Sequence, residues 1–158
     1  MSKQHLLRTE PSVLEATIRM PPGLLAINDK FEVAPIRRKG KAPRYEIRLK
    51  SSFRAAIHEA IIFVRQAVVS SGWQMRGSAA AWVMTHWPGD EEEGDVDATI
   101  KAALDALEGG GVVSNDKVIR PVWLDARYNS VQPGIRIRVY PNAGALLDAI
   151  VEERKQLL

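Results

Sequence analysis

The sequence of 158 residues contains no cysteine, only three histidines and few aromatic residues, which make up 6% of the chain. The absence of cysteine excludes disulfide bonds, zinc–thiolate sites and thiol catalysis. The three histidines share no metal-ligand spacing, and serine and histidine never cluster, so no Ser-His-Asp arrangement is indicated. No apolar run approaches the roughly 18–20 residues of a membrane span, and residues 1–5 lack the apolar core of a signal peptide. We therefore expect a cytoplasmic protein without a membrane partner.

Hydrophobic residues make up 46% of the chain and charged residues 26%, both near the average for globular proteins. This composition excludes a disordered tail, a collagen-like rod and a simple coiled coil. It is uniform along the chain, so we expect one domain over residues 1–158.

Charges of opposite sign gather in two separate segments, although the net charge is only +3. The basic segment holds Arg37, Arg38, Lys39, Lys41, Arg44, Arg48, Lys50 and Arg54. The acidic segment holds Asp90, Glu91, Glu92, Glu93, Asp95 and Asp97. A basic segment suits a polyanion such as nucleic acid, whereas an acidic cluster repels polyanions unless it binds metal. Together they indicate metal-dependent chemistry on nucleic acid, and two solvated loops of opposite charge are the alternative.

Hydrophobic periodicity predicts four strands and three helices. The strands are expected over residues 12–20, 79–87, 117–124 and 135–140. The helices are expected over residues 52–71, 97–108 and 143–157, with Ser52 as the N-cap of the first and Gly72 at its end. The resulting order β-α-β-α-β-β-α predicts an α+β domain with a mixed sheet.

Two further local signals complete the expected organisation. Pro121 lies within the third strand, which favours an edge position or a bulge. Residues 23–50 have poor periodicity and contain Pro35, Gly40 and Pro43, which predicts a long, basic, mobile loop.

Three carboxylates and one lysine are the candidates for chemistry. Asp95 and Asp97 are two residues apart, so in extended backbone both project to one side and can reach one ion. Asp116 follows the helix that Asp97 begins, and Lys101 lies one helical turn after Asp97. Two structural alternatives stay open: Asp97 is also a good N-cap, and Asp97 with Lys101 is also an ordinary surface pair.

Read as one string, residues 95–116 resemble the RusA family of Holliday junction resolvases. That family carries Asp-x-Asp-Asn, a lysine four residues after the second Asp, a stretch ending Asp-Ala-Leu, a glycine and an acidic pair. The matching positions are Asp95, Asp97, Lys101, Asp105-Ala106-Leu107, the glycines 109–111 and Asp116. Pro21-Pro22 is similar to the motif that closes the family's first strand. The chain departs from the pattern at Ala98, where the family has Asn, and at Asn115, where it has the first acid of the pair.

The resemblance implies a homodimeric, Mg²⁺-dependent endonuclease that cuts two strands of a four-way DNA junction symmetrically. Carried over by motif position, Asp95, Asp97, Lys101 and Asp116 are the expected catalytic residues, and the three aspartates are the expected metal ligands. An all-oxygen ligand set suits Mg²⁺ and also Mn²⁺. A nuclease specific for flaps or other branched DNA, and a non-catalytic DNA-binding partner of the same fold, are the alternatives.

The resemblance also gives the cationic residues a role in contacting DNA. The expected contacts are Arg37, Arg38, Lys39, Lys41, Arg44, Lys50, Arg136 and Arg138. Such a protein is bacterial or phage-encoded and acts inside the cell in recombination, repair or phage genome processing.

Overall fold

A four-stranded mixed sheet lies at the centre of the computed structural model, which describes residues 13–19, 31–36, 44–89 and 96–156. At Phe31, Arg44 and residues 96–98 it describes the backbone alone. The sheet order is β1 (Leu14–Ile18), β6 (Gly134–Tyr140), β4 (Ala79–His86) and β5 (Ile119–Arg127). Strand β4 is parallel to β5, and the other pairs are antiparallel. The α+β domain with a mixed sheet is thereby confirmed.

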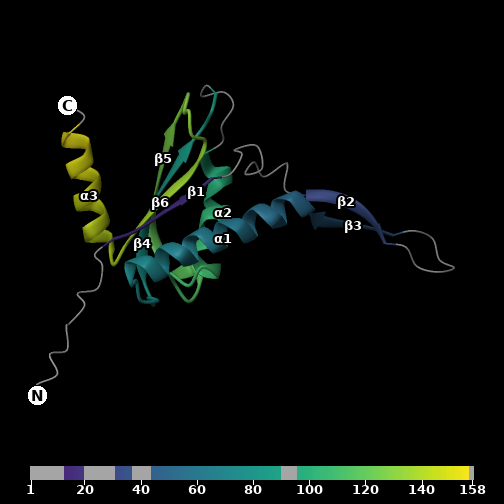
Figure 1. Ribbon diagram of the computed structural model, residues 1–158, viewed down its shortest axis with the longest axis horizontal. Helices are drawn as coiled ribbons and strands as arrows, with labels where there is room; N and C mark the ends of the chain where they lie inside the picture. Colours follow the sequence, from purple (N-terminus) through teal and green to yellow (C-terminus); the bar gives the residue numbers. More distant parts are fainter. Residues whose placement is uncertain (1–12, 20–30, 37–43, 90–95, 157–158) are drawn as a thin grey trace, which may run out of the picture.

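The two faces of the sheet are covered by different helices (Figure 1). Helices α1 (Ser51–Ser71) and α2 (Val96–Gly109) cover one face, and α3 (Ala143–Lys155) lies against the other. Because β4 is central, its side chains alternate between two cores: Ala79, Ala81 and Val83 belong to the core under α1 and α2, and Ala80, Trp82 and Met84 to the core under α3. Strand β4 is therefore buried on both faces.

Helix α2 approaches its neighbours through small side chains. Its fully buried residues include Ala102, Ala103 and Ala106, whereas Ile100 and Leu104 are half-buried. The spacing of Ile100, Ala103, Leu104 and Leu107 predicts one apolar stripe, but the buried side is rotated toward the alanines, which permit closer contact between α2 and α1 than larger side chains do. This rotation leaves Lys101 on the exposed side of the helix.

The expected loop over residues 23–50 is wrong in the part of this segment that the structure describes. Strands β2 (Phe31–Ile36) and β3 (Arg44–Leu49) form an antiparallel hairpin that projects from the beginning of α1, away from the main sheet (Figure 1). The alternation of charged and apolar residues over 44–49 is the signal of this strand, and the prolines and the dense positive charge around it obscure that signal. The true order is therefore β-β-β-α-β-α-β-β-α.

Two of the three local predictions, those for Gly72 and Pro121, agree with the structure, and the one for Ser52 does not. Gly72 ends α1 in the left-handed conformation at φ +74°, and its N–H donates to the Val68 carbonyl. Pro121 lies on edge strand β5, next to a register shift between β4 and β5. Ser52 is not the N-cap, because α1 already begins at Ser51 and Lys50 is the cap residue. None of the helices in the described ranges is long and apolar enough to cross a membrane.

Candidate active site

Asp116 lies against helix α2, where it forms an ion pair with Lys101. Lys101 Nζ donates to Asp116 Oδ2 at 2.9 Å and lies 2.6 Å from Asp105 Oδ1. The Asp105 side chain is 38% exposed and the Asp116 side chain 19%. One ammonium group therefore serves two carboxylates, of which Asp116 is the less accessible.

These contacts fix the charge state of the pair. Hydrogen bonds, first with Asp105 and then with Asp116, raise the pKa of Lys101 well above its usual value. The hydrogen bond from Lys101 is also the main reason why the pKa of Asp116 is lowered, and the charge of Lys117 contributes less. At neutral pH the carboxylate is therefore ionised, and the lysine is a permanent cation that cannot accept a proton.

A tight turn after α2 returns the chain to place Asp116. The backbone N–H of Asp116 donates to Glu108 Oε2 at 3.0 Å, and Asn115 Oδ1 accepts from the Lys117 N–H at 2.9 Å. At Gly110 an added Cβ would collide with the Val64 side chain, so the turn packs against α1 only because this residue is glycine. Asn115 thus caps the short 3₁₀ helix Asp116–Val118. This is the position at which the RusA pattern has the first acid of its pair.

The beginning of α2 is tied to the end of β4 by a buried hydroxyl pair. Thr85 Oγ1 and Thr99 Oγ1 are 2.8 Å apart, and both side chains are fully buried. Position 97 lies in the first turn of α2, one turn before Lys101, and this places it inside the helix rather than at the N-cap. The side chain of Asp97 lies outside the described part of the structure, as does the whole of Asp95.

The predicted metal ligands are therefore described only in part. Within residues 13–19, 31–36, 44–89 and 96–156, no group of three His, Cys, Asp or Glu side chains is arranged to hold a metal ion. Asp116 is the one predicted ligand whose side chain is described. It is an ionised oxygen donor, which is the chemistry that Mg²⁺ and Mn²⁺ require, so it fits the implied metal.

The predicted DNA contacts are distributed over several parts of the chain. Residues 37–39 and Lys41 lie outside the described residues, Arg44 begins β3, and Lys50 precedes α1. Arg136 and Arg138 lie on β6, on the face of the sheet opposite α1 and α2. Among the described residues, Lys50 at the start of α1 and the two arginines of β6 thus lie on different parts of the fold.

Arg136 and Arg138 are both engaged in ion pairs. Arg136 Nε donates to Glu15 Oε1 at 2.7 Å, and Arg138 Nη1 donates to Glu153 Oε2 at 2.5 Å. Arg138 also lies over the ring of Trp82, with 5.4 Å from its guanidinium carbon to the ring centroid. Its side chain is only 22% exposed, so Arg138 has a structural role in addition to any contact with DNA.

Sequence reasoning missed the residues that position the site. Thr85 is a polar residue in a strand that is otherwise apolar, which is the signal of a buried hydrogen bond. Glu108 carries no such signal, because charged residues on an exposed helix face are ordinary, whereas Asp105 is already part of the matching motif.

The structure thus gives an α+β domain in which an ionised Asp116 carboxylate is paired with a lysine cation. The family model described as Endodeoxyribonuclease RusA matches residues 37–140, well over half of the chain. The chain therefore belongs to the RusA family, and it is an endodeoxyribonuclease of the Holliday junction resolvase type. None of the curated proteins compared with it gives a match.

Proposed function

We propose that the protein is a homodimeric, Mg²⁺-dependent resolvase that cuts two strands of a four-way junction symmetrically. The observation that carries the proposal is the ion pair between Lys101 and Asp116, formed one helical turn after Asp97. Membership of the RusA family supports the junction as substrate. Mn²⁺ is the alternative metal, since it accepts the same oxygen ligands.

Asp95, Asp97 and Asp116 are the proposed metal ligands. Three neighbouring carboxylates repel one another unless a cation offsets their charge. When bound, the metal supplies Lewis-acid activation of the scissile phosphate and of the attacking water. Asp116 contributes a carboxylate that is ionised at neutral pH, because Lys101 lowers its pKa.

Lys101 is the proposed stabiliser of charge on the phosphate. Its raised pKa keeps it protonated, so it acts as a hydrogen-bond donor and a fixed cation, and another group must accept the proton of the attacking water. Its Nζ is shared by two carboxylates in this structure. A phosphate oxygen would become a third acceptor, and Lys has three N–H donors to serve all of them.

The proposed dimer follows from the reaction and not from an observed interface between two chains. Two symmetric cuts on one junction need two active sites related by a two-fold axis, and a C2 dimer is the commonest way to supply them. Light scattering at micromolar concentration should give twice the mass of the chain.

The proposed DNA contacts are the cationic residues 37–39, Lys41, Arg44, Lys50, Arg136 and Arg138. Each contact with a phosphate releases counterions, so junction affinity should fall steeply with salt. Replacing Arg37, Arg38 and Lys39 by Ala should weaken binding and flatten the salt slope by up to about one unit per lost contact. The proposed setting is inside the cell, in recombination, repair or phage genome processing.

A cleavage assay on three DNAs tests the function. A four-way junction, a flap and a plain duplex of matched sequence are incubated with Mg²⁺, with Asp116→Asn as the inactive control. Paired nicks in the junction alone support the proposal. Preferential cleavage of the flap would replace it with the branch-specific nuclease that is the second candidate, and equal cleavage of all three would contradict structure specificity.

A further inference from the structure

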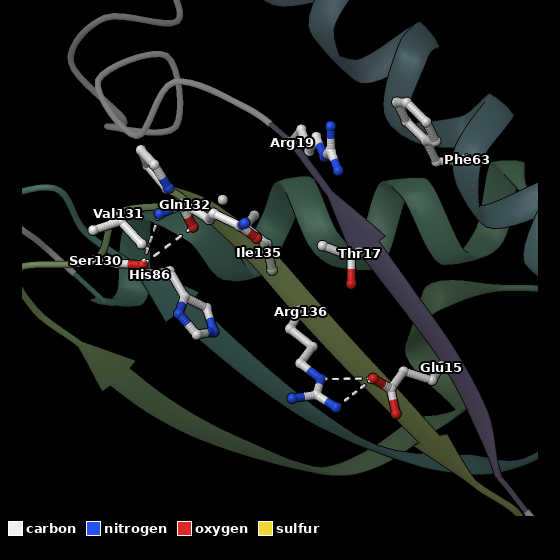
Figure 2. Close-up of a pocket in the computed structure, with 12 residues that line it drawn as sticks. Glu15, Thr17, Arg19, Phe63, His86, Ser130, Val131, Gln132, Ile135 and Arg136 are labelled. Atoms are coloured by element: carbon white, nitrogen blue, oxygen red, sulfur yellow. Dashed lines mark hydrogen bonds and ion pairs between the residues drawn. The ribbon is translucent and has the colours of Figure 1, made fainter.

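A second charged feature lies at one end of the sheet, and neither Lys101 nor Asp116 contributes to it. A cleft of about 1050 Å³ is lined by β1, β6, the connection between β5 and β6, the end of β4 and Phe63 of α1 (Figure 2). Its polar residues include Glu15, Arg19, His86 and Arg136. Its lining also includes the exposed apolar side chain of Val131, so it offers both charged and apolar surface to a ligand.

The cleft opens at the end of the strands from which the chain continues into α2. Strands β1 and β4 are both antiparallel to β6, so Arg19 after β1 and His86 at the end of β4 lie at the same end. The hydroxyl pair Thr85–Thr99 holds the first turn of α2 at this end too. The cleft therefore lies at the end of the sheet where α2 begins.

The cations of the cleft belong to a chain of alternating charges. Arg136 pairs with Glu15, and Arg138 lies between Glu15, at 3.5 Å, and Glu153, at 2.5 Å. Arg127 approaches Glu153 at 3.9 Å. Three guanidinium groups thus alternate with two carboxylates, which leaves one positive charge in surplus within this chain of ion pairs.

Glu15 is the acid that limits this positive charge within the cleft itself. Figure 2 shows the Glu15 carboxylate and the Arg136 guanidinium facing each other across β1 and β6. His86 adds little charge at neutral pH, since burial and then the charges of Arg136 and Arg127 lower its pKa. Arg19 and Arg136 are therefore the cations that a ligand in the cleft meets.

We propose that this cleft binds the sugar-phosphate backbone of a DNA strand next to the cut, and that Glu15 competes with the phosphate for Arg136. A guanidinium group binds carboxylate and phosphate with the same forked geometry, so one can replace the other. The apolar surface of the cleft suits the sugar and base faces of a strand. Glu15 and Arg19 lie outside the residues that the family model matches. This inference rests on the proposed function for the nature of the ligand.

The test measures junction affinity without divalent metal, so that binding is separated from cleavage. Removing the competing carboxylate should give tighter binding for Glu15→Gln, roughly threefold to tenfold, with a steeper salt dependence. Arg136→Gln should weaken binding and flatten the salt slope by about one unit. Thermal unfolding of both variants checks that they are folded.

Two comparisons separate competition from a general change in charge. Glu152→Gln makes the same charge change on an exposed side chain of α3 that does not line the cleft, and it should alter affinity less than twofold. In an Arg136→Gln background, Glu15→Gln should lose most of its effect, because the two residues act on one another. The proposal would be overturned if Glu15→Gln and Glu152→Gln increased junction affinity equally. It would also be overturned if Glu15→Gln gave the same increase in the Arg136→Gln background.

The result is independent of the cleavage assay. If the wild-type protein cuts junctions while Glu15→Gln leaves affinity unchanged, the cleft assignment is wrong and the proposed function stands. If Glu15→Gln binds more tightly but no junction is cut with Mg²⁺, the cleft is a DNA site and the proposed reaction is wrong.

Discussion

Two ionic clusters on opposite faces of the sheet differ in the sign of their surplus charge. On α2 the single ammonium group of Lys101 is shared by Asp105 and Asp116, so acid is in excess. Across β1, β6 and α3, guanidinium groups outnumber the carboxylates of Glu15 and Glu153. An excess of carboxylate attracts a metal cation, whereas an excess of guanidinium attracts phosphate.

The two clusters also differ in how they are held in place. Asp116 is held in the turn after α2, where its backbone N–H donates to Glu108. Lys101 is held by α2 itself, which packs against its neighbours through buried alanines. The arginine cluster is placed by the register of β1 against β6, in which Glu15 lies opposite Arg138 and next to Arg136. The first arrangement suits chemistry, which depends on accurate placement, and the second suits contact with a polymer.

The largest expected effect separates the two acids that share Lys101. Asp116→Asn should lower the junction cleavage rate by about 10²–10³-fold, because a proposed metal ligand loses its charge, while junction binding persists. Asp105→Asn is the matched control: it removes an acid from the same lysine but not from the proposed ligand set, and it should stay within about tenfold. Single-turnover rates measure both. A dead Asp105→Asn beside an active Asp116→Asn would place the chemistry on the other acid.

A smaller effect tests the turn that positions Asp116. Gly110→Ala puts a Cβ against the Val64 side chain and within 2.9 Å of the Ala106 carbonyl oxygen, so it should lower the free energy of unfolding by ~1–3 kcal/mol. Gly77→Ala is the control, since nothing lies within 4 Å of its added Cβ. Urea denaturation measures the difference. Equal stability of the two variants would mean that the turn yields easily and does not fix Asp116.

The hydroxyl pair at the start of α2 should contribute less. Thr85→Val removes one partner of a buried hydrogen bond and should cost about 1 kcal/mol in the free energy of unfolding. The double variant Thr85→Val/Thr99→Val should cost less than the sum of the two single changes, because no hydroxyl then remains from the pair. Additive costs in urea denaturation would show that the two residues act independently.

The main sheet and its helices were predictable because their patterns are local. The apolar run of β4, the alternation of β6 and the spacing of α1 each reflect burial, and burial dominates folding. The hairpin of β2 and β3 was missed because Val33, Tyr45 and Ile47 stay exposed: their alternation is not accompanied by a core that would distinguish it from a loop.

The candidate residues of the site could be named from the sequence, whereas most of their contacts could not. Motif spacing singled out Lys101 and Asp116, and the structure brings them within 2.9 Å. The contact of Glu108 with the Asp116 N–H, and the pairing of Arg136 with Glu15 across 121 positions, depend on tertiary placement that no local pattern contains. The pair of Lys101 with Asp105, by contrast, has the ordinary i, i+4 spacing of a helix. The metal-ligand roles of Asp95 and Asp97 stay predictions.

The smallest expected effect concerns the charge of Asp116 itself. Lys101 is the main cause of its lowered pKa, so Lys101→Met should raise that pKa toward the usual value of about 3.9. Lys117→Met is the matched control, because the charge of Lys117 contributes less. A lowered carboxyl pKa stabilises the fold above the unfolded value near 4, and the benefit disappears as pH falls through the folded value. The stability difference between wild type and Lys101→Met should therefore shrink between pH 5 and pH ~2. Carboxyl NMR titration of Asp116 gives the pKa directly. An unchanged midpoint in Lys101→Met, or an equal shift in Lys117→Met, would mean that the ion pair with Lys101 does not control this carboxylate, and the contrast between the two faces would then have to be attributed to the turn alone.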